Sequence, residues 1–264
     1  FRPMHMITLT SDWKEHDFYV ASLKGKLLSA CPEAQIIDIN HQIRSFNTSH
    51  AAFIVRNAYP NFPENTIHII TINSEPEKGK DLLAAKKDNH YFLCADNGIL
   101  GLLGGNEPAE VITLKDHYDK APGTFIALSV FAKVACELSK GTPLSKLGSP
   151  ATAYDRQTPL RATIENNTIT GSVIHIDSYQ NAITNISREL FDRVGNGRTY
   201  EIFVQSKHYK LDRINRQYNE TDPGDLLAIF NSSGLLEIAI RDGNAAGLLK
   251  LNTNSTIRVE FKEG

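Results

Sequence analysis

Short polar clusters follow the first two β-rich runs of the chain. Ser11 and Asp12 close the first run, and Asp38 and His41 lie at the end of the next. A carboxylate at a strand end can accept two hydrogen bonds from a vicinal diol such as that of a ribose. Asp12 could equally cap the following helix, and a lone histidine such as His41 is more often structural than catalytic. The residue types thus indicate a ribose-binding or proton-transfer site, with a structural role as the alternative.

A second polar cluster lies in the C-terminal half. Asp177 and Asn181 flank a short polar stretch that could hold the ammonium or carboxylate group of an amino acid, although asparagine-rich turns produce the same pattern. His175 and Asp177 share one face of a strand, but no third ligand accompanies them, so no metal site is expected.

Several enzyme classes lose support because their motifs are missing from the sequence. It contains no phosphate-binding P-loop, no Gly-x-Gly-x-x-Gly after a strand, no Gly-x-Ser-x-Gly elbow and no His-Glu-x-x-His. The net charge of -2 shows no basic surplus, so no nucleic-acid partner is expected. No apolar run approaches the roughly 20 residues of a membrane-spanning helix, so no membrane association is expected.

The cysteines are few and widely spaced. Cys31, Cys94 and Cys136 are odd in number and lie in apolar surroundings, which argues against a disulfide framework and against a Cys-x-x-Cys metal site. We interpret them as buried thiols in a reducing compartment, and the expected location of the protein is therefore cytoplasmic.

The elements that must position these residues alternate between β-rich and amphipathic helical runs in the first half. Strands are predicted over 6–10, 35–39, 67–72, 91–95 and 110–114, and helices over 18–30, 49–58 and 125–140. After residue 150 the pattern changes to short strands separated by Asn and Gly turns, with little helix. The sequence predicts an α/β protein with an N-terminal α/β sheet domain over 6–150 and a smaller all-β, barrel-like domain over 151–264.

Taken in order, these clusters resemble the S-adenosylmethionine hydroxide adenosyltransferase family, which includes fluorinases and chlorinases. The matching stretches span nearly the whole chain, and they are individually weak but specific as an ordered set. They are Ile7 to Asp12, Asp17 to Val20 with Lys24-Gly25, Ile37 to His41, Phe62-Pro63, Thr66 to His68, Asp96 to Leu100, Thr124-Phe125, Asp177 to Ile186, Asn231-Ser232 with Gly234, Leu236 to Ala239 and Gly243 to Ala245.

The resemblance implies a homotrimer whose ligand site lies between the N-terminal domain of one subunit and the C-terminal domain of the next. S-adenosylmethionine would be the substrate or ligand, with no further cofactor. By position, Asp12 matches the ribose-diol carboxylate, and Phe46 and Phe125 match the walls around the sugar. Methionine-holding groups correspond to Asp177, Asn181 and Ser232, and the adenine-reading main chain corresponds to Asn244 and Ala245.

The residues that handle the attacking water in the family are replaced in this sequence. Asn73 stands at the family's Asp position, Lys80 at its Arg position and Ile126 at its His position. Asn73 cannot act as a carboxylate base, Ile126 cannot carry a proton, and Lys80 offers a point charge where Arg offers a planar fork. The polar residue that fluorinases use is Ala127 here, so halogenation is not inherited either.

We therefore expect a protein that binds S-adenosylmethionine and hydrolyses it to adenosine and methionine, at reduced or altered efficiency. Glu75 or Glu77 could replace the lost carboxylate, and His41 or His68 the lost imidazole. The alternative is a non-catalytic trimer that keeps the adenosyl pocket as a sensor or for another nucleoside. A third possibility is a homologue whose pocket is closed by bulky side chains such as Phe46, Leu128 and Tyr179.

Overall fold

The computed structural model describes residues 6–75, 80–118 and 124–262, which form two compact units. The first unit ends at Pro159 and the second begins at Leu160. The extended segment after residue 150 packs on the first unit: Ala151 N donates to Val111 O at 2.9 Å, and Asp155 N donates to Asp96 Oδ1 at 2.7 Å. Residues 151–159, which the sequence predicts at the start of the second domain, therefore lie with the first unit.

The first unit is built on one mixed sheet with the strand order β2-β1-β3-β5-β4-β6-β7. The strands β2, β1, β3 and β5 are parallel, whereas β4 runs antiparallel to both of its neighbours. Their bounds are β1 (Met6–Ser11), β2 (Gln35–Asn40), β3 (Ile67–Thr71), β4 (Leu82–Lys87), β5 (His90–Ala95), β6 (Glu110–Thr113) and β7 (Ser149–Pro150).

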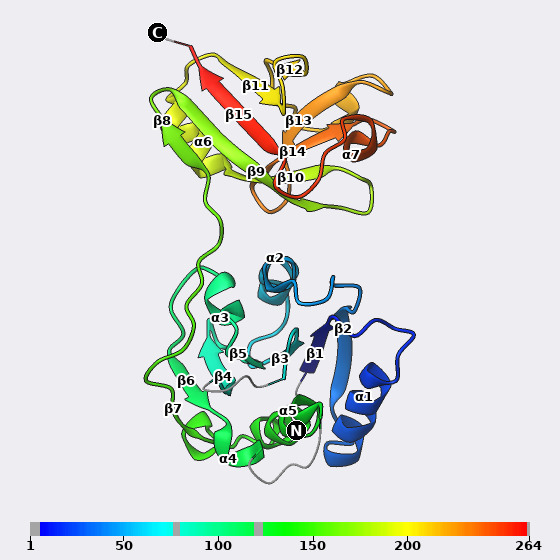
Figure 1. The fold of residues 1–264 in the computed structure, drawn as a ribbon, viewed down its shortest axis with the longest axis vertical. Coiled ribbons are helices and arrows are strands. Elements are labelled where there is room, and N and C mark those ends of the chain that lie inside the picture. The colour runs from blue at the N-terminus through cyan, green and yellow to red at the C-terminus, as the bar shows by residue number, and fades with distance from the viewer. Residues whose placement is uncertain (1–5, 76–79, 119–123, 263–264) are drawn as a thin grey trace. The chain divides into compact units, whose positions relative to one another are not determined.

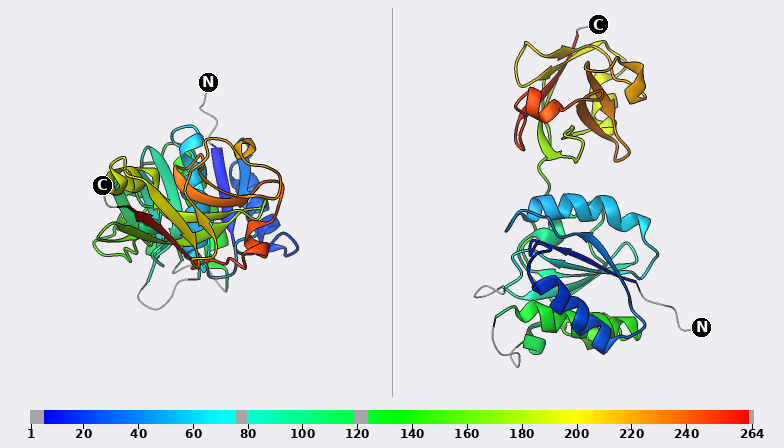
Figure 2. Two further views of the ribbon diagram at one scale, coloured as in Figure 1. Left: turned by 90° about the horizontal axis from the view of Figure 1, so that it is seen from above. Right: turned by 90° about the vertical axis from the view of Figure 1, so that its right-hand side faces the viewer.

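Helices cover both faces of this sheet, as Figure 2 shows in its right-hand view. Alternate strand residues point to opposite faces, so Ile67 and Ile69 pack on the side of α1 and α5, and Ile70 on the side of α2. The helices are α1 (Tyr19–Ala30), α2 (Thr48–Ala58), α3 (Ile99–Leu102), α4 (Lys115–Tyr118) and α5 (Ile126–Ser139), with 3-10 turns η1 (Tyr59–Asn61) and η2 (Leu144–Lys146).

The second unit is an antiparallel sheet with the order β12-β11-β15-β9-β10-β14-β13, and β8 pairs with β9 (Figure 1). Asn215, a few residues after β12, bridges to Ile229 of β13 and so brings the two ends of the sheet together in a barrel-like form. The bounds are β8 (Thr163–Glu165), β9 (Thr168–Ile176), β10 (Ala182–Ser187), α6 (Arg188–Gly195), β11 (Tyr200–Val204), β12 (Lys210–Leu211), η3 (Tyr218–Glu220), β13 (Leu226–Phe230), β14 (Leu235–Ile240), α7 (Ala245–Leu248) and β15 (Thr256–Phe261).

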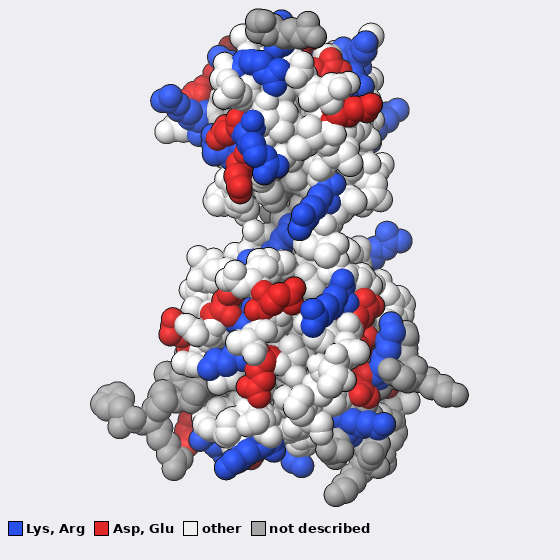
Figure 3. All heavy atoms as spheres, turned by 90° about the vertical axis from the view of Figure 1, so that its left-hand side faces the viewer, with Lys and Arg blue, Asp and Glu red and all other residues white. Residues whose placement is uncertain are grey.

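The predicted fold class is confirmed: an α/β sheet unit is followed by a smaller all-β, barrel-like one. On the face shown in Figure 3, positive and negative side chains are interspersed over both units. Among the described residues, no helix combines the length and apolar character that crossing a membrane requires.

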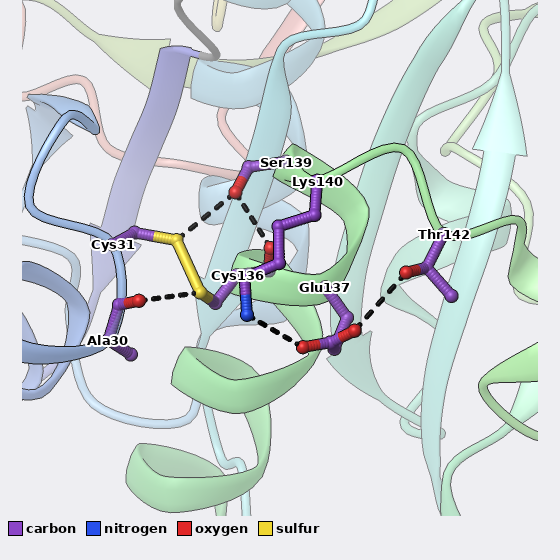
Figure 4. The surroundings of a disulfide bond; sticks show 7 residues. All are labelled: Ala30, Cys31, Cys136, Glu137, Ser139, Lys140 and Thr142. Atoms are coloured by element: carbon purple, nitrogen blue, oxygen red, sulfur yellow. Dashed lines mark hydrogen bonds and ion pairs between the residues drawn. A yellow bond between two sulfur atoms is a disulfide. The ribbon is translucent and has the colours of Figure 1, made fainter.

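The expectation of three free thiols was wrong, because Cys31 and Cys136 form a disulfide (Figure 4). They are 105 residues apart in sequence, but their Cα atoms lie 5.6 Å apart because α1 and α5 pack side by side. Spacing along the chain does not reveal such a pair, since it depends on which helices become neighbours. Cys94 is the free cysteine. The argument from free thiols for a reducing compartment no longer holds.

A buried histidine pair lies on the α2 side of the first sheet. His68 Nδ1 lies 2.7 Å from Thr8 Oγ1, and His68 Nε2 lies 3.2 Å from His90 Nδ1. Burial, assisted by the charge of His90, lowers the pKa of His68 to about 3. Burial also lowers the pKa of His90, so both rings are neutral in the folded protein at neutral pH.

Acid is expected to destabilise the first unit through His68. The ordinary histidine pKa of 6.5 lies above the folded value, so the unfolded chain binds more protons as the pH falls below 6.5. Between pH 6.5 and about 4.5 the free energy of unfolding should fall by about 2–3 kcal/mol from this group. Urea unfolding of His68→Gln should show a shallower loss across this range than the exposed control His208→Gln, and equal slopes would contradict the assignment.

Candidate active site

Asp12 lies just beyond β1 and links the segments that follow three parallel strands. Its Oδ2 accepts a hydrogen bond from Phe46 N at 2.9 Å and a longer one from Asn73 N at 3.4 Å. Neither contact uses Oδ1, so the carboxylate keeps acceptor capacity for a ligand hydroxyl. The position agrees with the rule that ligands bind beyond the carboxyl ends of parallel strands.

Three of the candidate residues in this unit have left-handed backbone. The φ angles are 64° at Phe46, 43° at Asn73 and 57° at Phe125. This conformation is costly for a bulky residue such as phenylalanine, and such outliers cluster at functional sites. At Phe46 and Asn73 it accompanies a backbone N–H that is directed at Asp12.

Aromatic rings line the start of α5. Phe125 stacks on Tyr19 with ring centroids 4.1 Å apart, and it meets Trp13 edge-on at 6.1 Å. Phe46 is different, because 73% of it is exposed in this unit. Phe46 and Tyr179, which is 79% exposed, therefore do not fill a pocket within their own units, whereas Leu128 is buried in the core. Two of the three residues suggested to close the pocket, Phe46 and Tyr179, therefore do not close one within their own units.

Asn73 and Lys80 line the same small depression, together with a third candidate, Glu75. The other lining residues are Asp81, Ala95, Asp96 and Asn97. Lys80 Nζ lies 3.8 Å from Asp155 Oδ2. Asn97 Nδ2 donates a hydrogen bond to Ile72 O at 2.8 Å, and this bond holds the backbone just before Asn73 in place. The structure thus brings an amide, an ammonium and a carboxylate together in one depression, and the backbone N–H of Asn73 links it to Asp12. Glu77 lies outside the described residues.

Neither suggested substitute imidazole lines that depression. His41 is buried, with Nδ1 2.6 Å from Ser11 Oγ and Nε2 3.1 Å from Asp38 Oδ1. Burial acts to raise the pKa of Asp38, but the hydrogen bonds and charges of Lys24 and His41 outweigh it and hold that pKa below its usual value. His68 points to Thr8 and His90 in the core. Neither His41 nor His68 therefore shares the depression of Asn73 and Lys80.

Ile126 opens α5 and packs against the hydrophobic core of the first unit, and the neighbouring Ala127 is completely buried. Both side chains are apolar, so this turn of the chain contributes no proton carrier.

In the second unit, Asp177 organises the turn between β9 and β10. Its Oδ1 accepts from Tyr179 N at 2.9 Å and from Asn181 N at 2.8 Å. Gln180 O in this turn accepts from Ala246 N at 2.9 Å, so the turn lies beside the start of α7. Asn244 caps that helix by accepting from Gly247 N at 2.6 Å. The structure brings Asp177, Asn181, Asn244 and Ala245 together at one end of β14.

Ser232 is not part of this group. It lies in the turn between β13 and β14, whereas the turn of Asp177 lies beside the other end of β14, since Ala182 pairs with Ile238. The six residues of β14 span about 17 Å. Ser232 and Asn244 could therefore contact only opposite ends of one elongated ligand.

Sequence reasoning missed a buried carboxylate in this unit. Glu237 is 2% exposed and accepts from Tyr218 Oη at 2.7 Å and from Asn231 Nδ2 at 3.1 Å. Burial, followed by the hydrogen bond and charge of Glu237 and the charge of Asp177, raises the pKa of Tyr218. A glutamate within the apolar stretch from Leu235 to Ile240 was the signal that could have revealed this network.

Comparison with known proteins agrees with this arrangement. The N-terminal domain model of the SAM hydroxide adenosyltransferases matches residues 7–148, and the C-terminal domain model matches residues 171–258. The chain therefore belongs to the SAM hydroxide adenosyltransferase family, as its ordered motifs predicted.

Individual relatives match over nearly their full length. An (R)-S-adenosyl-L-methionine hydrolase of Methanocaldococcus jannaschii is 27% identical, over 98% of this chain and 97% of the relative. A fluorinase of Nocardia brasiliensis is 24% identical, over 98% and 97%. A crystal structure of an uncharacterized conserved protein from Thermotoga maritima superimposes with a TM-score of 0.86 at 27% identity, covering 96% of this chain and 99% of that one.

Proposed function

We propose that this protein hydrolyses S-adenosyl-L-methionine to adenosine and methionine, with water as the nucleophile. The observation that carries the proposal is the Asp12 carboxylate, which binds the backbone of Phe46 and Asn73 through one oxygen and adjoins a polar depression. Full-length similarity to hydrolases that act on the (R) epimer supports the same substrate. Asp12 would hold the ribose diol, and Phe46 and Phe125 would flank the sugar.

The reaction needs no acid and no metal at the leaving group. The water oxygen attacks C5′ as the C5′–S bond breaks, and methionine departs as a neutral thioether that carries the bonding electron pair. The enzyme must align and desolvate the nucleophile and accept one proton. We propose that Glu75 accepts this proton, while Lys80 and Asn73 orient the water from the same depression.

In the proposed assembly the protein is a homotrimer, and the ligand site lies between the N-terminal unit of one subunit and the C-terminal unit of the next. Asp177 and Asn181 would hold the methionine portion, and the main chain at Asn244 and Ala245 would read the adenine edge. Ser232 lies at the other end of β14 and is not assigned to either portion. Sedimentation with and without adenosine tests the trimer. A cytoplasmic location remains a prediction, for which cell fractionation is the test.

A direct assay separates catalysis from binding alone. Purified protein is incubated with (R)-S-adenosylmethionine, with and without chloride, and chromatography follows adenosine, 5′-chloroadenosine and methionine. We expect adenosine and methionine in equal amounts, no chloride dependence, and no product with Asp12→Ala. Ligand binding without any product would instead favour the non-catalytic binding protein, a hypothesis motivated by Asn73 and by Ile126, which packs against the core.

Restoring the family's histidine alone is expected to achieve little. Ile126→His should change the rate of hydrolysis by less than about threefold, because residues that act as a unit are strongly non-additive. The measurement is kcat for both proteins at saturating substrate. An increase in kcat of a hundredfold or more would show that Asn73 and Lys80 can already position water for a histidine base. It would contradict the role given to Glu75.

A further inference from the structure

The Cys31–Cys136 disulfide joins the C-terminal ends of two neighbouring helices of the first unit (Figure 4). Cys31 directly follows α1, and Cys136 lies in the last turn of α5. At the opposite ends of these helices, Tyr19 stacks on Phe125. α1 and α5 are therefore tied at both ends, by a covalent bond at one and by the aromatic wall of the candidate site at the other.

Both sulfur atoms already have the hydrogen-bond partners that thiols would need. Cys136 Sγ lies 2.9 Å from Ala30 O, and Cys31 Sγ lies 3.1 Å from Ser139 Oγ. The Ser139 hydroxyl donates to Cys136 O at 2.7 Å, so its oxygen can accept from a Cys31 thiol. Reduction would thus leave no buried donor unsatisfied, which removes one large cost of breaking the bond in place.

A hollow of about 420 Å³ lies between the two helices, and Cys136, which is 2% exposed, forms part of its lining. Three lysines and one glutamate surround it, Lys26, Lys133, Lys140 and Glu137, which gives a local formal charge of +2. Lys140 pairs with Glu137 at 3.0 Å, leaving Lys26 and Lys133 as the cations available to a ligand. The hollow has the size of a small-molecule site and favours an anion.

From this geometry we propose that Cys31 and Cys136 form a redox site that exchanges with small anionic thiols of the glutathione class. The thiolate of the small molecule attacks Cys136 Sγ, the Sγ–Sγ bond breaks, and Cys31 leaves as a thiolate that takes up a proton beside Ser139. A second small thiol attacks the mixed disulfide and releases Cys136. Two small thiols are oxidised to one disulfide, and the protein disulfide is reduced to two thiols.

Cys94 provides an internal contrast. It is 1% exposed, close to the 2% of Cys136, but it does not line the hollow, and burial, assisted by the charge of Asp96, raises the pKa of its thiol to about 12. Such a thiol carries almost no thiolate at neutral pH and is not expected to exchange. Peptide mapping should therefore find the mixed disulfide on Cys136 and leave Cys94 unmodified.

The test compares an anionic with a neutral reductant on the native protein. Reduction by glutathione and by 2-mercaptoethanol, at matched thiolate concentrations, is followed by intact mass and by counting thiols. In Lys26→Gln/Lys133→Gln the glutathione rate should fall about tenfold while the 2-mercaptoethanol rate changes less than about twofold. Lys207→Gln, an exposed lysine of the second unit, serves as the control and should leave both rates unchanged.

The fold of the reduced protein is measured in parallel by circular dichroism and by thermal unfolding. We expect native spectra and a cooperative unfolding transition for the reduced protein. We also expect the lysine substitutions to lower only the rate of reduction by glutathione. The proposal is overturned if both reductants act at equal rates in all variants, or if reduction proceeds only at the rate of unfolding, because the disulfide would then be purely structural. The result does not depend on whether S-adenosylmethionine is hydrolysed.

Discussion

Asp12→Ala is expected to weaken adenosine binding by about 100-fold to 10,000-fold and to abolish detectable hydrolysis. Two charge-assisted hydrogen bonds to a ribose diol are worth roughly 1.5–3 kcal/mol each, and both are lost. The substitution also releases the N–H groups of Phe46 and Asn73, which Asp12 Oδ2 binds in the native protein. Calorimetric titration with adenosine and with 2′-deoxyadenosine provides the measurement.

The deoxynucleoside separates loss of the diol contact from loss of the fold. The native protein should discriminate strongly between the two nucleosides, whereas Asp12→Ala should bind both equally weakly. Glu15→Ala removes an exposed carboxylate from the same loop, outside the matching stretches, and should behave as the native protein. Unchanged adenosine affinity in Asp12→Ala, with native circular dichroism, would show that the ribose assignment is wrong.

The second large effect is expected at Glu75. Glu75→Gln should lower kcat about 100-fold, because a positioned general base typically contributes a factor of 10² to 10⁴. Adenosine affinity should stay within about twofold, since Glu75 lines the depression beside Asn73 and Lys80 and is not assigned to any ligand portion. Single-turnover kinetics and adenosine titration together measure both quantities.

Glu33→Gln is the matched control for Glu75, because it removes an exposed carboxylate after α1 and should leave kcat unchanged. A Glu75→Gln enzyme with native kcat would remove Glu75 from the mechanism without affecting the ribose site. A parallel loss of kcat and of adenosine affinity would instead indicate that Glu75 shapes the pocket.

Most of the parallel sheet could be predicted from sequence, because its strands are short apolar runs that alternate with amphipathic helices. β1 and β3, with their almost completely buried residues, follow this pattern closely. β4 was missed, since its sequence Leu-Leu-Ala-Ala-Lys-Lys carries no β-branched residue and becomes a strand only by pairing with β5 and β6. β10 was missed because its Thr184 and Asn185 resemble a polar loop, and α6 was missed with it.

In the candidate site, too, the features set by local sequence could be predicted, whereas those set by distant parts of the chain could not. Asp12 could be singled out because it follows a strand, and the ordered motifs identified its role by resemblance. That Asn73, Glu75 and Lys80 share one depression depends on where Lys80, just before β4, lies relative to the end of β3, which periodicity does not reveal. That His41 and His68 lie outside this depression could not be predicted for a related reason, because both rings turn toward partners on neighbouring strands.

The most direct test of the central claim is hydrolysis of (R)-S-adenosylmethionine in water enriched in oxygen-18, with mass analysis of both products. The account predicts adenosine that carries one heavy oxygen at the 5′ position, methionine without label, and no label above background with Asp12→Ala. Adenosine without the heavy oxygen would contradict water attack at C5′. The absence of any adenosine, despite measurable ligand binding, would contradict the assignment of this chain as a hydrolase.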